Sequence, residues 1–229
     1  MIATQNSRPN RIKAQSGFNL IEIAIVLVII GVLLGGLLTP LSTQYDASRR
    51  KGANTTLSDV HDALLGFAAT NGRLPCPATA ASNGLAAPNN ATTTCTSNHG
   101  FVPIRTLGLN GSIDANTLLL DPWLNTIRYS VSNANGGAYT NDITLSLVPD
   151  FQICGQACGN VIADNVVAVL LSQGEDTTAS TDQGENTDGD TIFVNRDLSE
   201  AVGDEFDDQL YWISPSILSY HLVRAGQLD

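Results

Sequence analysis

Signatures of catalysis are missing from this chain. It contains no G-x-S-x-G, no P-loop and no G-x-G-x-x-G, the patterns that hold a nucleophile or a nucleotide phosphate. Its three histidines, His61, His99 and His221, are far apart in the sequence. A membrane-anchored hydrolase would need a constellation that only the fold brings together. We therefore predict that the protein is not an enzyme.

Basic residues are also few. The chain has 11 Lys and Arg against 22 Asp and Glu, which gives a formal net charge of −11. The segment 175–208 alone holds twelve acids and one base, Arg196. A surface this acidic repels a phosphate backbone, so we expect no direct binding of nucleic acid. Residues 1–17 differ, because they contain three bases and no acid.

Charge is absent from residues 23–38, which are all apolar or glycine. Together with residues 18–21 they reach the length of about 20 residues that crosses a bilayer, which predicts a transmembrane segment. A secretory signal peptide and an ordinary single-pass anchor are the alternatives. No A-x-A-like cleavage site follows Leu38, and a plain anchor does not explain the carboxylate of Glu22 beside the run.

The residues that open this segment form a known pattern. Gly17-Phe18-Asn19-Leu20-Ile21 followed by Glu22 resembles the prepilin signature of type IV pilins and type II secretion pseudopilins. The resemblance implies that prepilin peptidase cuts between Gly17 and Phe18 and that the new N-terminal Phe18 is methylated. It also implies that Glu22 pairs with the positive N-terminal amine of a neighbouring subunit during assembly.

A second segment supports the resemblance. Asp121-Pro122-Trp123-Leu124-Asn125, followed by Arg128-Tyr129, is similar to the D-P-W-G-N-x-Y stretch of major pseudopilins, with Leu124 in place of the usual glycine. The region from residue 72 onward is larger than the head of a typical major pseudopilin. This size favours a minor pilin over that subgroup.

The apolar pattern after the first segment indicates an amphipathic helix. Leu57, Val60, Leu64 and Phe67 recur at three- and four-residue spacing, and Asn71-Gly72 ends the pattern. We expect an α+β fold with one long N-terminal helix, its first half transmembrane and its second half packed on an antiparallel β-sheet head. The expected domains are a leader (1–17), the pilin-like helix (18–71, with 18–41 in membrane or filament core) and a periplasmic head (72–229).

Strands and a last helix are predicted within the head. β-branched or aromatic runs bounded by turn residues predict strands at 127–132, 143–148, 166–172, 191–196 and 209–213. The continuous apolar run within 166–172 favours a central strand, and Asn135-Gly136-Gly137 predicts a hairpin turn. Ser214 and Pro215 are typical of a helix start, and Gly226 of its end.

Four cysteines, Cys76, Cys95, Cys154 and Cys158, make an even set outside the apolar segment. In an exported domain they would most simply pair as neighbours, Cys76 with Cys95 and Cys154 with Cys158, although three connectivities are possible. Free buried thiols and a metal site are the alternatives. No histidine lies near either pair, so the zinc pattern is weak.

The acidic segment also predicts a calcium site. Hard oxygen ligands on a flexible loop suit Ca²⁺, and major pseudopilins hold calcium in a C-terminal loop. The segment does not match an EF-hand, and a solvated acidic loop is the alternative. The candidate ligands are Asp182, Glu185, Asn186, Asp188 and Asp190.

These features predict a structural subunit, a minor pilin of a type IV pilus-like filament. A pseudopilin of a type II secretion system is the alternative within the class, and a membrane-anchored periplasmic binding module is the alternative outside it. Expected partners are prepilin peptidase, other pilin or pseudopilin subunits and the inner membrane. The expected location is a single pass in the inner membrane with a periplasmic head, then the pilus or pseudopilus.

Overall fold

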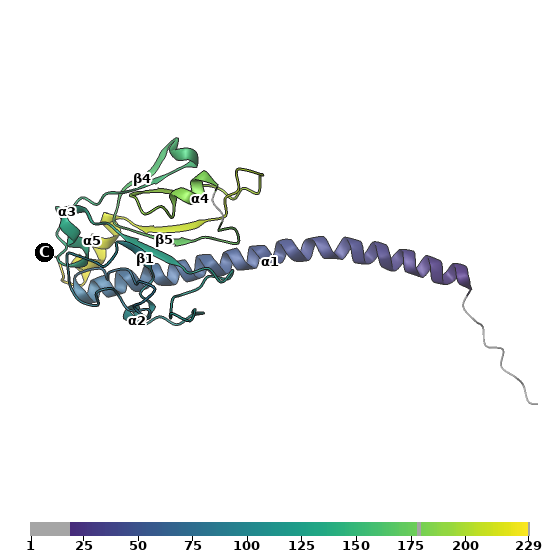
Figure 1. Ribbon diagram of the computed structural model, residues 1–229, viewed down its shortest axis with the longest axis horizontal. Coiled ribbons are helices and arrows are strands. Elements are labelled where there is room, and N and C mark those ends of the chain that lie inside the picture. Colours follow the sequence, from purple (N-terminus) through teal and green to yellow (C-terminus); the bar gives the residue numbers. More distant parts are fainter. Residues whose placement is uncertain (1–18, 178–179, 229) are drawn as a thin grey trace, which may run out of the picture. The chain divides into compact units, whose positions relative to one another are not determined.

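The computed structural model describes residues 19–177 and 180–228, and within the long first helix it describes no side chains for residues 34–42. The chain divides into two compact units, Met1–Asp46 and Ala47–Asp229. Helix α1 (Leu20–Asn71) contributes to both of them (Figure 1). Residues 47–71 of this helix therefore belong with the head. Gly17 and Phe18 lie outside the described residues.

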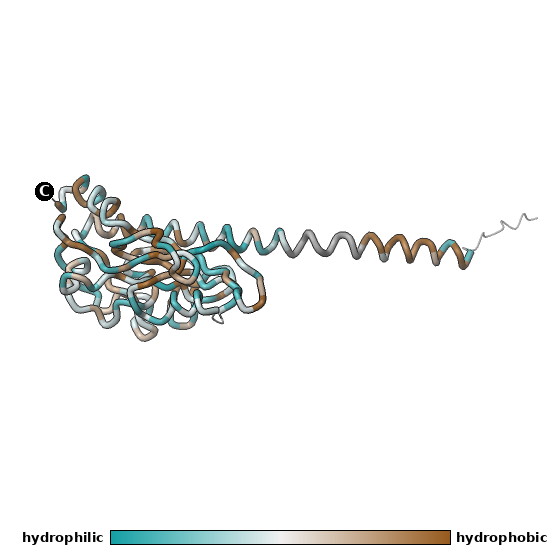
Figure 2. The backbone as a smooth tube through the Cα atoms, turned by 90° about the horizontal axis from the view of Figure 1, so that it is seen from above, coloured by the Kyte–Doolittle hydropathy of each residue, from teal (hydrophilic) through white to brown (hydrophobic). Residues whose placement is uncertain are grey.

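In the first unit, α1 begins with backbone hydrogen bonds from Glu22 and Ile23 to the carbonyl of Asn19. The apolar stretch that follows is solvent-exposed in the single chain, and Figure 2 shows it as a band of hydrophobic residues. The prediction of a transmembrane half is wrong for the described residues, none of which form a helix with the length and apolarity needed to cross a membrane.

In the second unit, residues 47–71 of α1 bury one stripe against the head. Leu57, Val60 and Leu64 are fully buried, as the spacing predicts. Phe67 is only half-buried, and Ala68 takes the next position of the stripe. The stripe belongs to the main core of the head.

A four-stranded antiparallel sheet lies against this stripe. It contains β1 (His99–Phe101), β2 (Arg128–Val131), β5 (Ala168–Ser172) and β7 (Gln209–Ile213), in the order β1-β2-β5-β7. All five residues of β5 are buried, which confirms the prediction of a central strand. Ala168 and Leu170 belong to the core that contains α1, whereas Val169 and Leu171 belong to a second core. Because successive strand residues face opposite sides, β5 has to be apolar throughout.

A three-stranded sheet contributes residues to the second core. Its strands are β3 (Phe151–Cys154), β4 (Val161–Val166) and β6 (Ile192–Val194), in the order β4-β3-β6. β3 pairs antiparallel with β4 but parallel with β6, so the prediction of a wholly antiparallel head is wrong. The long connection through β4, β5 and α4 (Thr181–Glu185) provides the crossover that a parallel pair needs. β4 and α4 lie on the side of β5 away from α1 (Figure 1).

The predicted strand at 143–148 is also wrong. This segment is a turn in which Leu145 is 61% exposed. Before it, Asn135-Gly136-Gly137 adopts positive φ in the short helix α3 (Ala134–Gly137) and leads to a 3₁₀ turn, η1 (Ala138–Thr140), instead of a hairpin. The Asn135 amide donates to the carbonyl of Val148 at 2.8 Å and so holds the segment as a closed loop.

The terminal helix α5 (Pro215–Arg224) confirms the capping prediction. The hydroxyl of Ser214 accepts from the backbone N–H of Ile217, Pro215 is the first helical residue, and Gly226 has φ +70°. Two further short helices complete the head, α2 (Ile104–Leu107) and η2 (Gln156–Cys158).

Both predicted disulfides are present. Cys76 is bonded to Cys95, and Cys154 is bonded to Cys158. The first bond closes the long loop that follows α1, and the second closes the turn between β3 and β4. Neighbour pairing is therefore confirmed, and no cysteine is free.

Candidate functional site

The first candidate site is the start of α1. Glu22 is exposed in the first turn of the helix, where a negative charge suits the helix dipole. Around it lies a set of large apolar side chains, each 46% exposed or more in the single chain. These are Leu20, Ile21, Ile23, Ile25, Val26, Leu27, Val28, Ile29, Ile30, Val32 and Leu33. A soluble chain rarely exposes so large a continuous apolar surface unless another molecule covers it.

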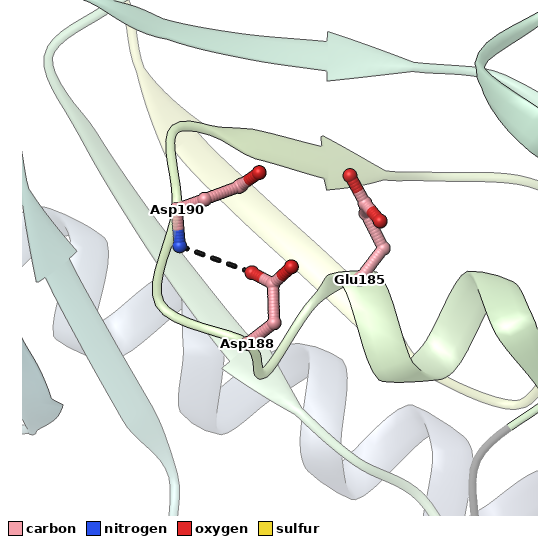
Figure 3. A group of neighbouring side chains, drawn as sticks. All are labelled: Glu185, Asp188 and Asp190. Atoms are coloured by element: carbon pink, nitrogen blue, oxygen red, sulfur yellow. Dashed lines mark hydrogen bonds between the residues drawn. The ribbon is translucent and has the colours of Figure 1, made fainter.

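The second candidate site is the acidic segment before β6. Glu185 ends α4, and Asp188 and Asp190 lie in the turn that follows (Figure 3). One carboxylate oxygen from each lies within 4.8 Å of the others, a spacing that a cation can bridge. The turn is held because Asp188 accepts from the backbone N–H of Asp190 at 3.0 Å. Partial burial and then the charges of Asp190, Asp188 and Asp182 raise the pKa of Glu185.

Two of the predicted calcium ligands, Asp182 and Asn186, do not belong to this cluster. Asp182 is buried and its carboxylate contacts Arg196 at 2.8 Å. Asn186 is buried and bonds both backbone groups of Val194. Positions 182 and 186 are four apart on α4 and its end, so they share a face, and both are buried, whereas Glu185 is only partly buried.

Arg196, the single base of the acidic segment, pairs with two of its acids. Its guanidinium contacts the carboxylates of Asp182 and Asp204, each at 2.8 Å, and lies 4.7 Å above the ring of Phe206. Only 10% of the side chain is exposed. The arginine therefore neutralises a buried acid and joins α4 to the loop that precedes β7.

Two adjacent acids, Asp207 and Asp208, accept hydrogen bonds from residues at the start of the acidic segment and from α4 and its end. Asp207 accepts from the backbone N–H groups of Glu175 and Asp176 and from the amide of Gln183. Asp208 accepts from the amide of Asn186 at 2.7 Å. Sequence reasoning missed this role, because the partners are more than twenty residues away along the chain.

The environment of Asp208 is unusual for an acid. Burial raises its pKa to about 7, and the negative charge of Asp207 adds to the effect. The hydrogen bond from Asn186 and the charge of Arg128 oppose the rise. At neutral pH this carboxyl therefore titrates inside the head.

The segment that resembles pseudopilins forms a tight turn. The buried carboxylate of Asp121 accepts from the backbone N–H groups of Trp123 and Asn125, each at 2.9 Å. Leu124 between them has φ +71°, in the left-handed region that favours glycine. The turn therefore has the conformation that the glycine of the similar stretch would suit. Asn125 fixes it to the head by donating to the carbonyl of Gly174 at 2.6 Å.

The three histidines lie on three separate elements. His61 is on α1 beside Asp62, His221 is on α5, and His99 is on β1. The ring of His99 packs on Phe151 and its Nδ1 lies 3.1 Å from the hydroxyl of Ser130. Burial lowers the pKa of His99, which favours its neutral form.

Comparison with known proteins adds no relative to these observations. No family model matches the chain, and neither the curated proteins nor the solved structures contain a match to it. A functional interpretation therefore depends on the residues of the two candidate sites and on the resemblance at residues 17–22 and 121–129.

Proposed function

We propose that this protein is a structural subunit of a type IV pilus-like filament, a minor pilin cut by prepilin peptidase between Gly17 and Phe18. It assembles through its N-terminal helix. The observation that carries the proposal is the surface of residues 20–33, where apolar side chains are exposed on every side of α1 around one acid, Glu22.

Packing energetics favour assembly through this surface. Burying one large aliphatic side chain yields about 1.5–3 kcal/mol, and the described part of the first unit exposes eleven of them. In a filament, neighbouring copies of the same helix cover these side chains. The association therefore needs no contribution from the head, which can differ between subunits.

The single acid sets the register of the assembly. A carboxylate buried among apolar side chains without a partner is strongly penalised. The amine of Phe18 on a neighbouring subunit supplies the opposite charge at one axial position only. Glu22 thus converts a non-directional apolar attraction into a fixed stagger between subunits.

The turn at Asp121–Asn125 supports the alternative within the class, a type II secretion pseudopilin. Leu124 adopts the left-handed conformation at the position where that stretch has glycine. Deleting the gene separates the two. Loss of surface fibres on deletion, together with presence of the chain in fibres sheared from the wild type, identifies a pilin. Loss of exoprotein secretion without any change in surface fibres identifies a pseudopilin.

The proposal is tested by replacing Glu22. We expect Glu22→Ala to reach its normal cellular level but to fall at least tenfold in sheared filaments, measured by immunoblotting. Asp59→Ala is the matched control, because Asp59 is an exposed acid on the same helix within the head unit. Normal incorporation of Glu22→Ala would refute the proposed role. A chain never found in filaments would instead favour an anchored binding module.

A further inference from the structure

The turn between β3 and β4 is closed by a disulfide with unequal ends. Cys154 is the last residue of β3 and is 1% exposed, whereas Cys158 is exposed. Only three residues separate the two cysteines. Closing so short a loop leaves Ala157 and Cys158 at φ +49° and +50°, a left-handed conformation that non-glycine residues rarely adopt.

The other disulfide shares none of these features. Cys76 is fully buried and Cys95 is half-buried, and eighteen residues lie between them. Neither residue has a positive φ. The chain therefore contains an internal control, one disulfide between covered residues and one that has an exposed residue at one end and a strained backbone.

The exposed bond is connected to the acidic segment. The backbone N–H of Ala157 donates to the carboxylate of Asp182 at 3.0 Å, and Asp182 is the buried partner of Arg196. Cys158, Asp182 and Glu185 also line one small cavity of about 180 Å³. A change in the turn thus reaches α4 through a single hydrogen bond.

We propose that Cys154–Cys158 is a thiol-exchange site, at which a dithiol attacks the sulfur of the exposed residue Cys158 and opening of the bond releases α4. The thiolate of the dithiol forms a mixed disulfide with Cys158 as the S–S bond breaks, and Cys154 leaves as a thiolate that takes up a proton. The second thiol of the dithiol then closes its own disulfide and expels Cys158. Both cysteines are reduced and the dithiol is oxidised, so two electrons and two protons are transferred.

Three observations select Cys158 as the attacked sulfur. It is exposed, so a thiolate can reach it, whereas Cys154 is 1% exposed. Opening also lets Ala157 and Cys158 leave the left-handed region, which favours the reduced form. Cys154 stays in place, because its carbonyl accepts from the backbone N–H of Asn195 at 2.8 Å.

The first test is selective reduction of the full-length protein. Dithiothreitol is titrated for a fixed time, free thiols are alkylated, and the modified peptides are quantified by mass spectrometry. We expect Cys154 and Cys158 to be labelled at a concentration at least tenfold below that which labels Cys76 and Cys95. Simultaneous labelling of both pairs, or earlier labelling of Cys76 and Cys95, overturns the proposal.

The second test addresses the backbone. Glycine tolerates a positive φ, so Ala157→Gly should shift the equilibrium about tenfold toward the disulfide in a redox buffer of dithiothreitol. Gln156→Ala is the matched control, because Gln156 is exposed in the same turn and has no positive φ, and it should leave the equilibrium unchanged. An unchanged equilibrium for Ala157→Gly contradicts the role of the strained turn.

The third test addresses direction and coupling. A disulfide reagent should react at least tenfold faster with Cys158 in Cys154→Ser than with Cys154 in Cys158→Ser, and the reverse order overturns the assignment of the attacked sulfur. Hydrogen exchange of residues 180–186 should rise when the wild-type bond is reduced. Equal protection in the two states would show that opening does not release α4.

Discussion

The two halves of α1 differ in the exposure of their leucines. Leu27 in the first half is 63% exposed, whereas Leu64 in the second half is fully buried. Two acids show the same contrast, Glu22 on the first half of α1 and Asp208 directly before β7. Glu22 is exposed with no described partner in the chain, while Asp208 is buried in the head that the second half supports.

The difference indicates where each half obtains its stability. The second half forms part of the main core together with the four-stranded sheet, so its leucines are buried within one chain. The first half has no such cover within the described residues, so its leucines gain only when another molecule buries them. One helix therefore serves folding at one end and, under our proposal, assembly at the other.

The sharpest way to test this comparison is to shorten one leucine in each half. We expect Leu64→Ala to lower the free energy of unfolding by about 2–5 kcal/mol, because it leaves a cavity in the core. Leu27→Ala, the matched control, should change it by less than about 0.5 kcal/mol. Urea unfolding followed by circular dichroism measures both. Equal effects would remove the distinction between the two halves.

The buried acid should make the stability of the head depend on pH. The pKa of Asp208 rises from the ordinary aspartate value of 3.8 to about 7 on folding, so the folded state binds the proton more tightly than the unfolded chain. The contribution of this proton to stability is present below pH 4 and is lost as the pH rises to 7. Asp208→Asn should remove this slope.

The size of that effect follows from the shift. One pKa unit corresponds to about 1.4 kcal/mol, and the weaker hydrogen bond from Asn186 offsets part of the gain, so we expect Asp208→Asn to be more stable by on the order of 2 kcal/mol at pH 8. Urea unfolding of both proteins from pH 5 to pH 9 gives the difference curve. A difference that does not vary with pH would show that Asp208 is not the titrating group.

An exposed leucine of the head gives a smaller effect of opposite sign. Leu124 is 72% exposed and has φ +71°, so its side chain contributes little while its backbone is strained. We expect Leu124→Gly to raise the free energy of unfolding by about 1 kcal/mol. Leu145→Gly, at an exposed position without a positive φ, should not stabilise. Equal responses of the two variants in urea unfolding would contradict the strain.

The smallest effect concerns the acidic cluster. If Glu185, Asp188 and Asp190 bind Ca²⁺ with a Kd of about 1 mM, 2 mM Ca²⁺ stabilises the head by about 0.6 kcal/mol. Differential scanning calorimetry should then show a rise of about 2 °C that chelator reverses. Glu185→Gln should abolish the rise. A rise that persists in that variant would place the cation elsewhere.

Sequence reasoning succeeded where a local pattern decides the structure. The apolar run of β5, the β-branched and aromatic run of β7 and the serine cap of α5 each contain their own signal. It failed for β1 and β4, because β1 has three residues and β4 shows no alternation of burial. Their pairing depends on strands distant in the sequence.

The candidate sites divide in the same way. The cluster of Glu185, Asp188 and Asp190 is local, so sequence reasoning found it. Asp182 and Asn186, two further predicted ligands, are buried and lie outside this cluster, and composition does not tell which face of α4 is buried. The ion pair of Arg196 with Asp182 and the hydrogen bonds that Asp207 and Asp208 accept are tertiary contacts between distant segments. No local pattern encodes them.

The most direct test of the account is the intact mass and N-terminal sequence of the protein isolated from its native envelope. We predict a chain that begins at Phe18 and carries one additional methyl group. A chain that retains Met1, or that is cut beyond Leu38, would contradict prepilin processing and with it the assembly role of Glu22.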